Sequence, residues 1–385
     1  MNKTEVGETY TKPTRVAPLN LSLIIPCYNE ENTIENCVEK VRKITQNQDI
    51  NLEIVIVNDC STDKSAEKLK EISAKYPEIK IFTHEKNRGK GAALRTGLLA
   101  ATGDFIGIQD ADDEYNPMEY LELLKPLLEN KADVVYGSRY LRPDTRRVLY
   151  LWHTWMNKSL TFVSNMFTNL DITDMETCYK LFKKEAIAKI APSLKEERFG
   201  FEPEITCKVA QAGFRVYEYA ISYNPRSYEE GKKIGWKDGV RALYCILHYS
   251  ANTAPLPMQL LLYFFIGGFS LFVNVSVFAI LHHAFNLPSI FDLNTNVIVA
   301  YIASSLVNYL LCIAILFRHK ARWSSAGEFI IYLIGVIIMG FVDYGLMWGI
   351  SAIGTPVIIS KTLAAGLGFI LNFALRRNVV FPEKK

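Results

Sequence analysis

Apolar residues are distributed differently in the two parts of this chain. Up to about Asn252, short apolar runs alternate with polar and amphipathic stretches, which is typical of a soluble α/β domain. From Leu256 onward apolar runs dominate, and four of them approach the roughly 20 residues that a helix needs to cross a bilayer. Any single run also fits a buried core helix, but four in series favour membrane spans. We expect four transmembrane helices at about 258–281, 297–317, 329–350 and 356–375.

The positions of basic residues predict the orientation of these spans. Three lie between the second and third spans, at 318–322, and four follow the fourth span, at 376–385, whereas the loops 282–296 and 351–355 contain no Lys or Arg. By the positive-inside rule, the soluble domain, the middle loop and the C-terminus lie in the cytoplasm. We therefore expect an integral protein of the plasma membrane with a cytoplasmic soluble domain.

Two charged residues interrupt the third and fourth spans. Asp343 and Lys361 lie at similar depth, on the order of 10 Å from the outer loop that joins these spans. Because a lone charge inside a membrane is costly, we expect an ion pair between them. Whether this pair is structural or contacts lipid is left open.

Within the soluble part, apolar strands end in polar residues. Strands expected at 21–26 and 52–57 lead into 27–31 and 58–63, and the apolar run at 105–108 ends in Asp110 and Asp112. The two carboxylates point the same way, because side chains on extended backbone repeat every two residues. In open α/β sheets ligands gather at the carboxyl ends of strands. Solvated loop acids are the commoner meaning of Asp-x-Asp alone, but two hard oxygen ligands at this edge suit Mg²⁺ or Mn²⁺ with phosphate oxygens.

Other polar segments supply candidate anion binders and acids. A Gly-rich basic loop at 85–92 contains Lys90 and precedes a helix, so it fits either a phosphate contact or an ordinary turn; it lacks the P-loop pattern. Arg139 follows a strand expected at 133–136, and its guanidinium suits phosphate. The remaining candidates are the acids Asp174, Glu202 and Glu204 and the bases Arg226, Lys232 and Lys233.

Two segments combine bulky apolar residues with polar ones. The stretch 148–170 is rich in Leu, Trp, Phe and Met but contains His and Lys, and 236–252 has a similar composition. Such helices suit the surface of a membrane, and packing in the domain core is the alternative for the first.

Composition excludes some other classes. A net charge of +3 gives no reason to expect nucleic acid as a partner, and the seven Cys residues have no metal-binding spacing, so we expect reduced thiols. Residues 1–18 are polar, and we expect them to be disordered rather than a signal peptide.

Six motifs in order resemble one enzyme family. They are Ile24–Glu30, Val57–Asp63, Asn87–Gly91, Asp110–Asp112, Gly137–Arg139 and Phe201–Glu204. As a set they resemble family 2 glycosyltransferases of GT-A fold, and within these the polyprenyl-phosphate sugar synthases, over about 21–238. The C-terminal part, ending in Asn372–Phe381, is similar to the GtrA-type four-helix domain. The resemblance implies a GT-A catalytic domain at 19–235, an interface helix at 236–252 and a membrane domain at 256–385.

The resemblance also implies roles for individual residues. The nucleotide would contact Pro26, Tyr28, Glu30 and Asp59, with Lys90 as a further substrate contact. Asp110 and Asp112 would hold the diphosphate and the metal, and Glu114 stands where the family often has a Gln near that metal. Phosphate of the donor or of the lipid would contact Arg139, Arg226 and Lys232.

The activity implied is transfer of one hexose from GDP-mannose or UDP-glucose to a polyprenyl or dolichyl monophosphate, with inversion. No residue decides between the donors, and the oligomeric state is open, a homo-oligomer included. One alternative is a hydroxyl-directed family 2 transferase, although the Q-x-x-R-W-type motif of many such enzymes is absent from the sequence. The other is a flippase of lipid-linked sugar.

Overall fold

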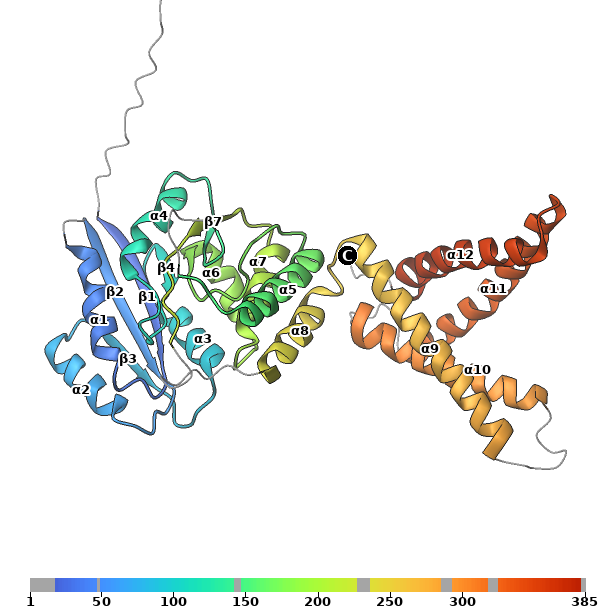
Figure 1. Ribbon diagram of the computed structural model, residues 1–385, viewed down its shortest axis with the longest axis horizontal. Helices are drawn as coiled ribbons and strands as arrows, with labels where there is room; N and C mark the ends of the chain where they lie inside the picture. The colour runs from blue at the N-terminus through green and yellow to red at the C-terminus, as the bar shows by residue number, and fades with distance from the viewer. Residues whose placement is uncertain are drawn as a thin grey trace, which may run out of the picture. The chain divides into compact units, whose positions relative to one another are not determined.

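The computed structural model describes residues 18–46, 49–141, 147–226, 236–284, 293–317 and 325–381. The chain divides into two compact units, each of which is described by itself (Figure 1). The first comprises Met1–Asn165 and Leu170–Ile246, and the second comprises Met166–Asn169 and Leu247–Lys385. The division falls inside helix α8 (Trp236–Ser250). The N-terminal segment expected to be disordered lies almost entirely outside the described residues.

A seven-stranded sheet forms the centre of the first unit. Its strands are β1 (Leu19–Cys27), β2 (Ile50–Asn58), β3 (Lys80–Thr83), β4 (Phe105–Ile108), β5 (Val134–Ser138), β6 (Lys180–Lys183) and β7 (Val216–Ala220). Their order across the sheet is β3-β2-β1-β4-β6-β5-β7, and β6 alone runs antiparallel to its neighbours β4 and β5. The expected α/β architecture is therefore confirmed.

The sequence of β1 explains its central place. Leu21, Leu23, Ile24 and Ile25 are fully buried. β1 pairs with β2 and β4 along its two edges, and the side chains on both of its faces are buried, so its sequence is an apolar run without alternation.

Helices cover both faces of this sheet (Figure 1). They are α1 (Ile34–Arg42), α2 (Ser65–Lys75), α3 (Lys90–Ala100), α4 (Tyr120–Leu128), α6 (Lys184–Ile190) and α7 (Phe201–Gln211). Helix α3 packs on β1 and β2, and α4 packs on β5 and β6. A short 3₁₀ turn at Pro117–Glu119 leads into α4, where the side chain of Asn116 accepts a hydrogen bond from the backbone N–H of Met118 at 3.2 Å. Pro117 fits this first turn because its missing N–H would have no helical partner there.

The two segments expected to lie on a membrane surface are helices. Helix α5 (Leu151–Thr168) and helix α8 both expose large apolar side chains. Trp152 is 74% exposed on α5 and Trp236 is 75% exposed on α8, while Thr161 and Ser164 are buried on α5. The two expected helices are therefore present in the structure. Their contact with lipid stays a prediction.

Long apolar helices make up the second unit. They are α9 (Leu256–Ala284), α10 (Leu293–Leu311) with its π-helical continuation Cys312–Phe317, α11 (Ser325–Ala352), and α12 (Val357–Leu375) with its π-helical continuation Arg376–Val380. Each expected span lies within one of these helices and its continuation, except that Pro356 precedes the first residue of α12. Among the described residues, Leu256–Leu281 and Val299–Phe317 are long and apolar enough to cross a membrane, and Gly327–Val342 is a shorter apolar stretch.

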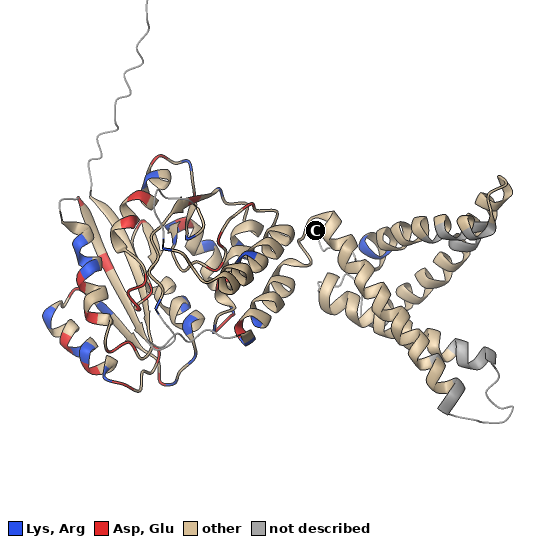
Figure 2. Ribbon diagram, in the orientation of Figure 1, with Lys and Arg blue, Asp and Glu red and all other residues tan. Residues whose placement is uncertain are grey.

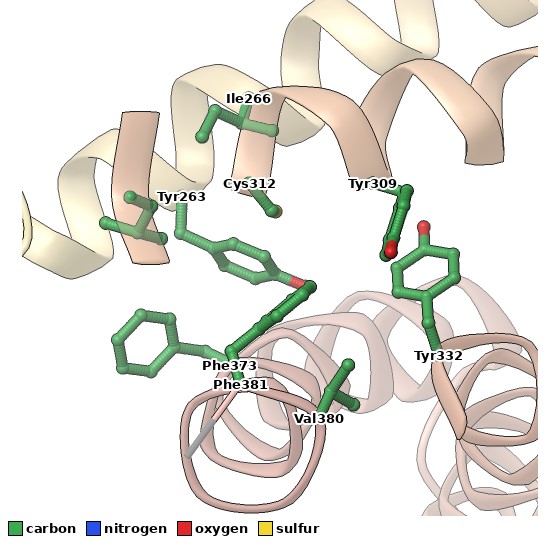
Figure 3. Close-up of a cluster of buried hydrophobic side chains, with 9 residues drawn as sticks. Tyr263, Ile266, Tyr309, Cys312, Tyr332, Phe373, Val380 and Phe381 are labelled. Atoms are coloured by element: carbon green, nitrogen blue, oxygen red, sulfur yellow. The ribbon is translucent and has the colours of Figure 1, made fainter. Parts of the chain in front are cut away.

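The interior of the second unit is aromatic. Tyr263, Tyr309, Tyr332, Phe373 and Phe381 form a buried cluster (Figure 3). Figure 2 shows charged residues throughout the first unit, whereas nearly all described residues of α9–α12 are uncharged. The expected ion pair between the spans lies outside the side chains that the structure describes.

Candidate active site

The carboxyl ends of β1, β2, β4, β5 and β7 meet at one cavity of about 540 Å³. Ten of the eleven residues expected at the site line this cavity: Pro26, Tyr28, Glu30, Asp59, Lys90, Asp110, Asp112, Glu114, Arg139 and Arg226. The eleventh, Lys232, lies outside the described residues, as does Lys233. The structure thus brings together residues that are up to 200 positions apart in the chain.

Asp110, just beyond β4, forms an ion pair with the start of helix α3. The ammonium of Lys90 lies 2.9 Å from Asp110 Oδ1 and 3.4 Å from Glu202 Oε1, and the thiol of Cys178 donates to Asp110 Oδ1 at 2.9 Å. Burial lowers the pKa of Lys90, but the neighbouring carboxylates raise it more, so its pKa is well above the usual value. Lys90 is therefore a fixed positive charge beside the first acid of the Asp-x-Asp pair.

Arg226 connects the loops that follow β1 and β4. Its guanidinium lies 2.9 Å from Glu30 Oε2 and 3.3 Å from Asp112 Oδ2. Burial and the carboxylates of Asp110 and Glu114 raise the pKa of Asp112 to about 7, although Arg226 and Lys90 oppose this shift. Burial and the neighbouring acids thus raise the pKa of Asp112 more than the two cations lower it.

The charge balance of the cavity fits a divalent cation. Seven carboxylates and four cationic side chains line it, so an anionic diphosphate would enter a cavity that is already net negative. Asp110 and Asp112 fit Mg²⁺ or Mn²⁺, which bind through one or two carboxylates together with phosphate oxygens. Both oxygens of Glu114 accept hydrogen bonds, from the hydroxyl of Tyr223 at 2.7 Å and from the backbone N–H of Arg226 at 2.8 Å.

Glu114, expected near the metal, is thus held by hydrogen bonds within the chain, and its role as a metal ligand stays a prediction. Among the described residues, no group of three or more His, Cys, Asp or Glu side chains is arranged to hold a metal ion. The site fits a cation that takes its remaining ligands from a bound molecule, and it does not fit a complete cage of protein side chains.

Asp59 holds the Gly-rich loop in place. Its buried carboxylate accepts from the backbone N–H groups of Gly89 at 2.6 Å and Arg88 at 2.9 Å, and lies 2.7 Å from Nδ1 of His84. Gly89 has a φ of +97°, and a Cβ there would lie 2.5 Å from the carbonyl oxygen of Glu197. Only glycine fits this position, and the contacts of Asp59 position Lys90 at the start of α3.

Arg139 is held in a fork by Asp174. Its Nε lies 2.7 Å from Oδ2 and its Nη2 lies 2.8 Å from Oδ1 of Asp174, which is fully buried. The charge of Asp174 outweighs burial and raises the pKa of Arg139 well above its usual value. Asp174, expected only as a candidate acid, is thus a positioning residue for Arg139.

Comparison with known proteins assigns both units. Residues 22–191 match the family described as Glycosyl transferase family 2, and residues 262–381 match GtrA/DPMS, transmembrane domain. The chain joins a family 2 glycosyltransferase domain to a GtrA/DPMS transmembrane domain. The fold class and the membrane domain expected from the sequence are confirmed.

Individual relatives differ in how much of the chain they cover. A dolichyl-phosphate beta-glucosyltransferase of Trichomonas vaginalis is 29% identical over 227 residues, which are 55% of this chain and 66% of that protein. A dolichol-phosphate mannosyltransferase of Pyrococcus furiosus is 24% identical over 367 residues, covering 94% of this chain and 99% of that protein. The chain thus spans just under two thirds of the length of the Trichomonas relative.

Comparison with solved structures also gives partial matches. Glucosyl-3-phosphoglycerate synthase from Mycobacterium tuberculosis, in complex with Mn²⁺, UDP and glucosyl-3-phosphoglycerate, has a TM-score of 0.46 and 16% sequence identity. The match covers 62% of this chain and 81% of that one.

The glycosyltransferase domain also places unexpected residues in its cavity. Glu176 and Cys178 precede β6, and Arg198 and Phe199 precede α7. Because β6 is antiparallel, its beginning and not its end lies beside the carboxyl end of β4. A search limited to the ends of expected strands therefore misses Glu176, and an antiparallel strand at 180–183 would have been the signal.

Two acids that line the cavity, Glu176 and Glu202, each have a buried oxygen without a hydrogen-bond partner among the described residues. These oxygens are Glu176 Oε1 and Glu202 Oε2. Burial and the charge of Glu202 raise the pKa of Glu176 to about 8. Glu204, the other expected acid of this segment, instead accepts from the backbone N–H groups of Lys195 and Glu196.

Proposed function

We propose that this protein transfers one hexose from a nucleotide diphosphate sugar to the phosphate of a polyprenyl or dolichyl lipid. The observation that carries the proposal is the cavity in which Asp110 and Asp112 meet Lys90, Arg139 and Arg226, in a chain that also has a transmembrane domain. The names of the two relatives, a dolichyl-phosphate glucosyltransferase and a dolichol-phosphate mannosyltransferase, support a lipid phosphate as acceptor. Glucose and mannose both remain candidate sugars.

Asp110 and Asp112 would hold Mg²⁺ or Mn²⁺, which neutralises charge on a nucleotide diphosphate when bound. The cationic side chains of the domain add to this neutralisation. Arg139 is held rigidly by Asp174 and Lys90 by Asp110, so both lie in place before a donor arrives. Fixed charges need little reorganisation during the reaction, and this favours stabilisation of the departing diphosphate.

The acceptor explains why no general base is required. A phosphate monoester has its second pKa at about 6, so the attacking oxygen is already largely anionic at neutral pH. The protein has to position two anions against each other and reduce their repulsion. Direct displacement of this kind inverts the anomeric centre.

The exposed apolar faces of α5 and α8 suit the surface of a membrane, where the phosphate of a lipid acceptor lies. With the catalytic domain in the cytoplasm, as the basic loops predict, the soluble donor and the lipid acceptor reach the cavity from different phases. This arrangement supports an integral enzyme of the plasma membrane.

Transfer by the purified full chain tests the proposal. The protein in detergent would be given labelled UDP-glucose or GDP-mannose with a polyprenyl phosphate, a polyprenol or a sugar as acceptor, with Mg²⁺ or Mn²⁺. We expect labelled lipid phosphate from one donor, and a loss of about 100-fold or more in Asp112→Asn, since charge stabilisation of the transition state is removed.

The matched control is Asp171→Asn, at an exposed acid outside the cavity. Transfer to a hydroxyl acceptor alone would favour the hydroxyl-directed alternative. An active Asp112→Asn variant would contradict the metal assignment, and no transfer with any donor would favour the flippase.

A further inference from the structure

A polar cavity of about 430 Å³ lies inside the otherwise apolar transmembrane unit. Helices α9 to α12 and the π-helical segment after α12 contribute its polar lining, which includes Ser270, Ser304, Asn308, Tyr332, Asn372 and Arg376. Nearly all other described residues of these helices are uncharged (Figure 2). The cavity belongs to the second unit alone and shares no residue with the glycosyltransferase cavity.

Arg376 is the cation of this cavity and is only 6% exposed. Its Nε donates to Asn372 Oδ1 at 3.1 Å, its Nη1 donates to Asn308 Oδ1, and its Nη2 lies 3.4 Å from the hydroxyl of Tyr332. The guanidinium carbon lies 4.7 Å from the centre of the Tyr332 ring and 5.4 Å from that of Tyr263. Both rings come from the aromatic cluster of Figure 3, on α11 and α9.

Every one of these partners is neutral. Among the described residues, no Asp or Glu forms an ion pair with Arg376, and Glu328, a buried acid of the same unit, accepts from the hydroxyl of Tyr309 at 3.1 Å. Charged residues inside membrane domains almost always pair with an opposite charge or line a functional site. The positive charge of Arg376 is therefore not neutralised by the part of the chain that the structure describes.

We propose that this cavity binds the phosphate group of a lipid, with Arg376 as its principal ligand. The planar guanidinium suits phosphate, and its aromatic and amide neighbours hold it in one orientation. Val336, Met339 and Phe369 also line the cavity, so a hydrocarbon chain attached to the phosphate has apolar surface to follow.

Depth favours a lipid phosphate over free phosphate. Arg376 directly follows the fourth expected span and Tyr332 lies three residues, about 5 Å, inside the third, so an anion beside Arg376 would lie at the end of the spans, where lipid phosphates lie. A free phosphate ion would lose its hydration there without gaining apolar contacts. That the lipid is an isoprenoid phosphate rests on the proposed function, whereas phosphate binding at Arg376 does not.

Photolabelling of the full chain tests the site. The probe is farnesyl phosphate with a photoreactive group, in a maltoside detergent that contains no phosphate, and labelled peptides are located by mass spectrometry. We expect labelling of peptides from α10–α12, blocked by unlabelled farnesyl phosphate but not by farnesol or inorganic phosphate. Equal competition by farnesol would overturn the proposal, and equal competition by inorganic phosphate would replace the lipid with a free anion.

Variants separate binding from a purely structural role. Arg376→Gln should lose more than about tenfold of this labelling, because a buried charge-assisted contact is removed, and Arg376→Lys should keep part of it. The matched control is Arg377→Gln, at the exposed neighbouring residue. Labelling that is unchanged in Arg376→Gln, or equally reduced in Arg377→Gln, would overturn the proposal.

The same experiment separates this site from the proposed function. Labelling of α10–α12 without any transfer activity would contradict the transferase and leave the lipid-phosphate site standing. Transfer activity with labelling confined to the first unit would support the transferase and contradict the lipid-phosphate site. If Arg376→Gln fails to fold, the competition experiments with unchanged protein still decide the question.

Discussion

The two cavities of this protein differ in the groups that surround their buried cationic side chains. In the glycosyltransferase domain, Lys90, Arg139 and Arg226 each lie within 2.9 Å of a carboxylate of the chain itself. In the transmembrane unit, Arg376 contacts only amide, hydroxyl, thiol and aromatic groups among the described residues. The first cavity holds its cations in place through carboxylates of the chain itself, whereas in the second cavity the proposed ligand would supply the missing charge.

Removing the carboxylate partner of a paired cation is the strongest test of this contrast. Asp174→Asn keeps the shape of the side chain but leaves the charge of buried Arg139 without its partner. We expect the free energy of unfolding to fall by about 3–5 kcal/mol, as for other buried pairs that lose one member. Denaturant unfolding of the full chain in detergent, followed by circular dichroism, measures this loss.

The control for that variant is Asp171→Asn, three residues earlier and exposed, which should change stability by less than about 0.5 kcal/mol. If Asp174→Asn were as stable as the control, Arg139 would not depend on its partner. The two cavities would then not differ in the way described.

The loop that presents Lys90 offers the next test. Gly89→Ala combines an unfavourable φ of +97° with a Cβ placed 2.5 Å from the carbonyl oxygen of Glu197, so the loop has to move. We expect kcat/KM for the nucleotide sugar to fall by about tenfold to 100-fold, since small displacements of positioning groups have effects of this size. Initial rates at varied donor concentration measure it.

Gly213→Ala is a control that separates the effect of backbone strain at a positive φ from the effect of moving the loop. Gly213 also has a positive φ, +70°, but a Cβ there meets nothing within 4 Å. This variant should lose about 1 kcal/mol of stability and keep its kcat/KM. Equal kinetic effects of the two variants would show that the position of Lys90 is not what matters.

The buried acid Glu176 in the first cavity makes the stability of the protein depend on pH. The pKa of Glu176 is raised from 4.5 to about 8, so between these pH values the folded protein holds a proton that the unfolded chain has lost. The free energy of unfolding therefore falls as pH rises through this window, by at most about 1.4 kcal/mol per pH unit for one proton. The glutamine of Glu176→Gln cannot ionise, so this loss is absent from the variant. The Tm of the variant minus that of the unchanged protein should therefore increase from pH 5 to pH 8.

Melting curves at several pH values measure this difference. Glu129→Gln, at an exposed acid beyond α4, is the control for a change of surface charge alone. A Tm difference that stays constant between pH 5 and pH 8 would mean that Glu176 does not carry the extra proton.

Sequence patterns predicted the parts of this molecule that depend on local chemistry. The apolar run of β1, the acids after β4 and the long helices α9–α12 follow from burial and length, which are visible in the residues themselves. The fork between Arg139 and Asp174, and the commitment of Asp59 to the loop of Gly89, depend on pairings across 30 or more positions. The local pattern of apolar and polar residues does not show such long-range pairings. It also does not show that the four-residue strand β6 is antiparallel, so the sequence did not indicate that Glu176 lies in the cavity.

The smallest predicted effect concerns a surface of the first unit that, like the helices of the second unit, exposes apolar side chains. Helix α5 exposes Trp152, as the membrane-spanning helices expose apolar residues, and we expect this face to contact lipid. Trp152→Ser should raise KM for the polyprenyl phosphate about threefold and leave KM for the nucleotide sugar unchanged, because only the acceptor arrives from the membrane. Kinetics in lipid nanodiscs measure both values, with Leu128→Ser on α4 as an exposed apolar control. If the two variants had the same KM values, the exposed face of α5 would not contact lipid. Lipid contact would then be expected of the second unit and not of this face of the first.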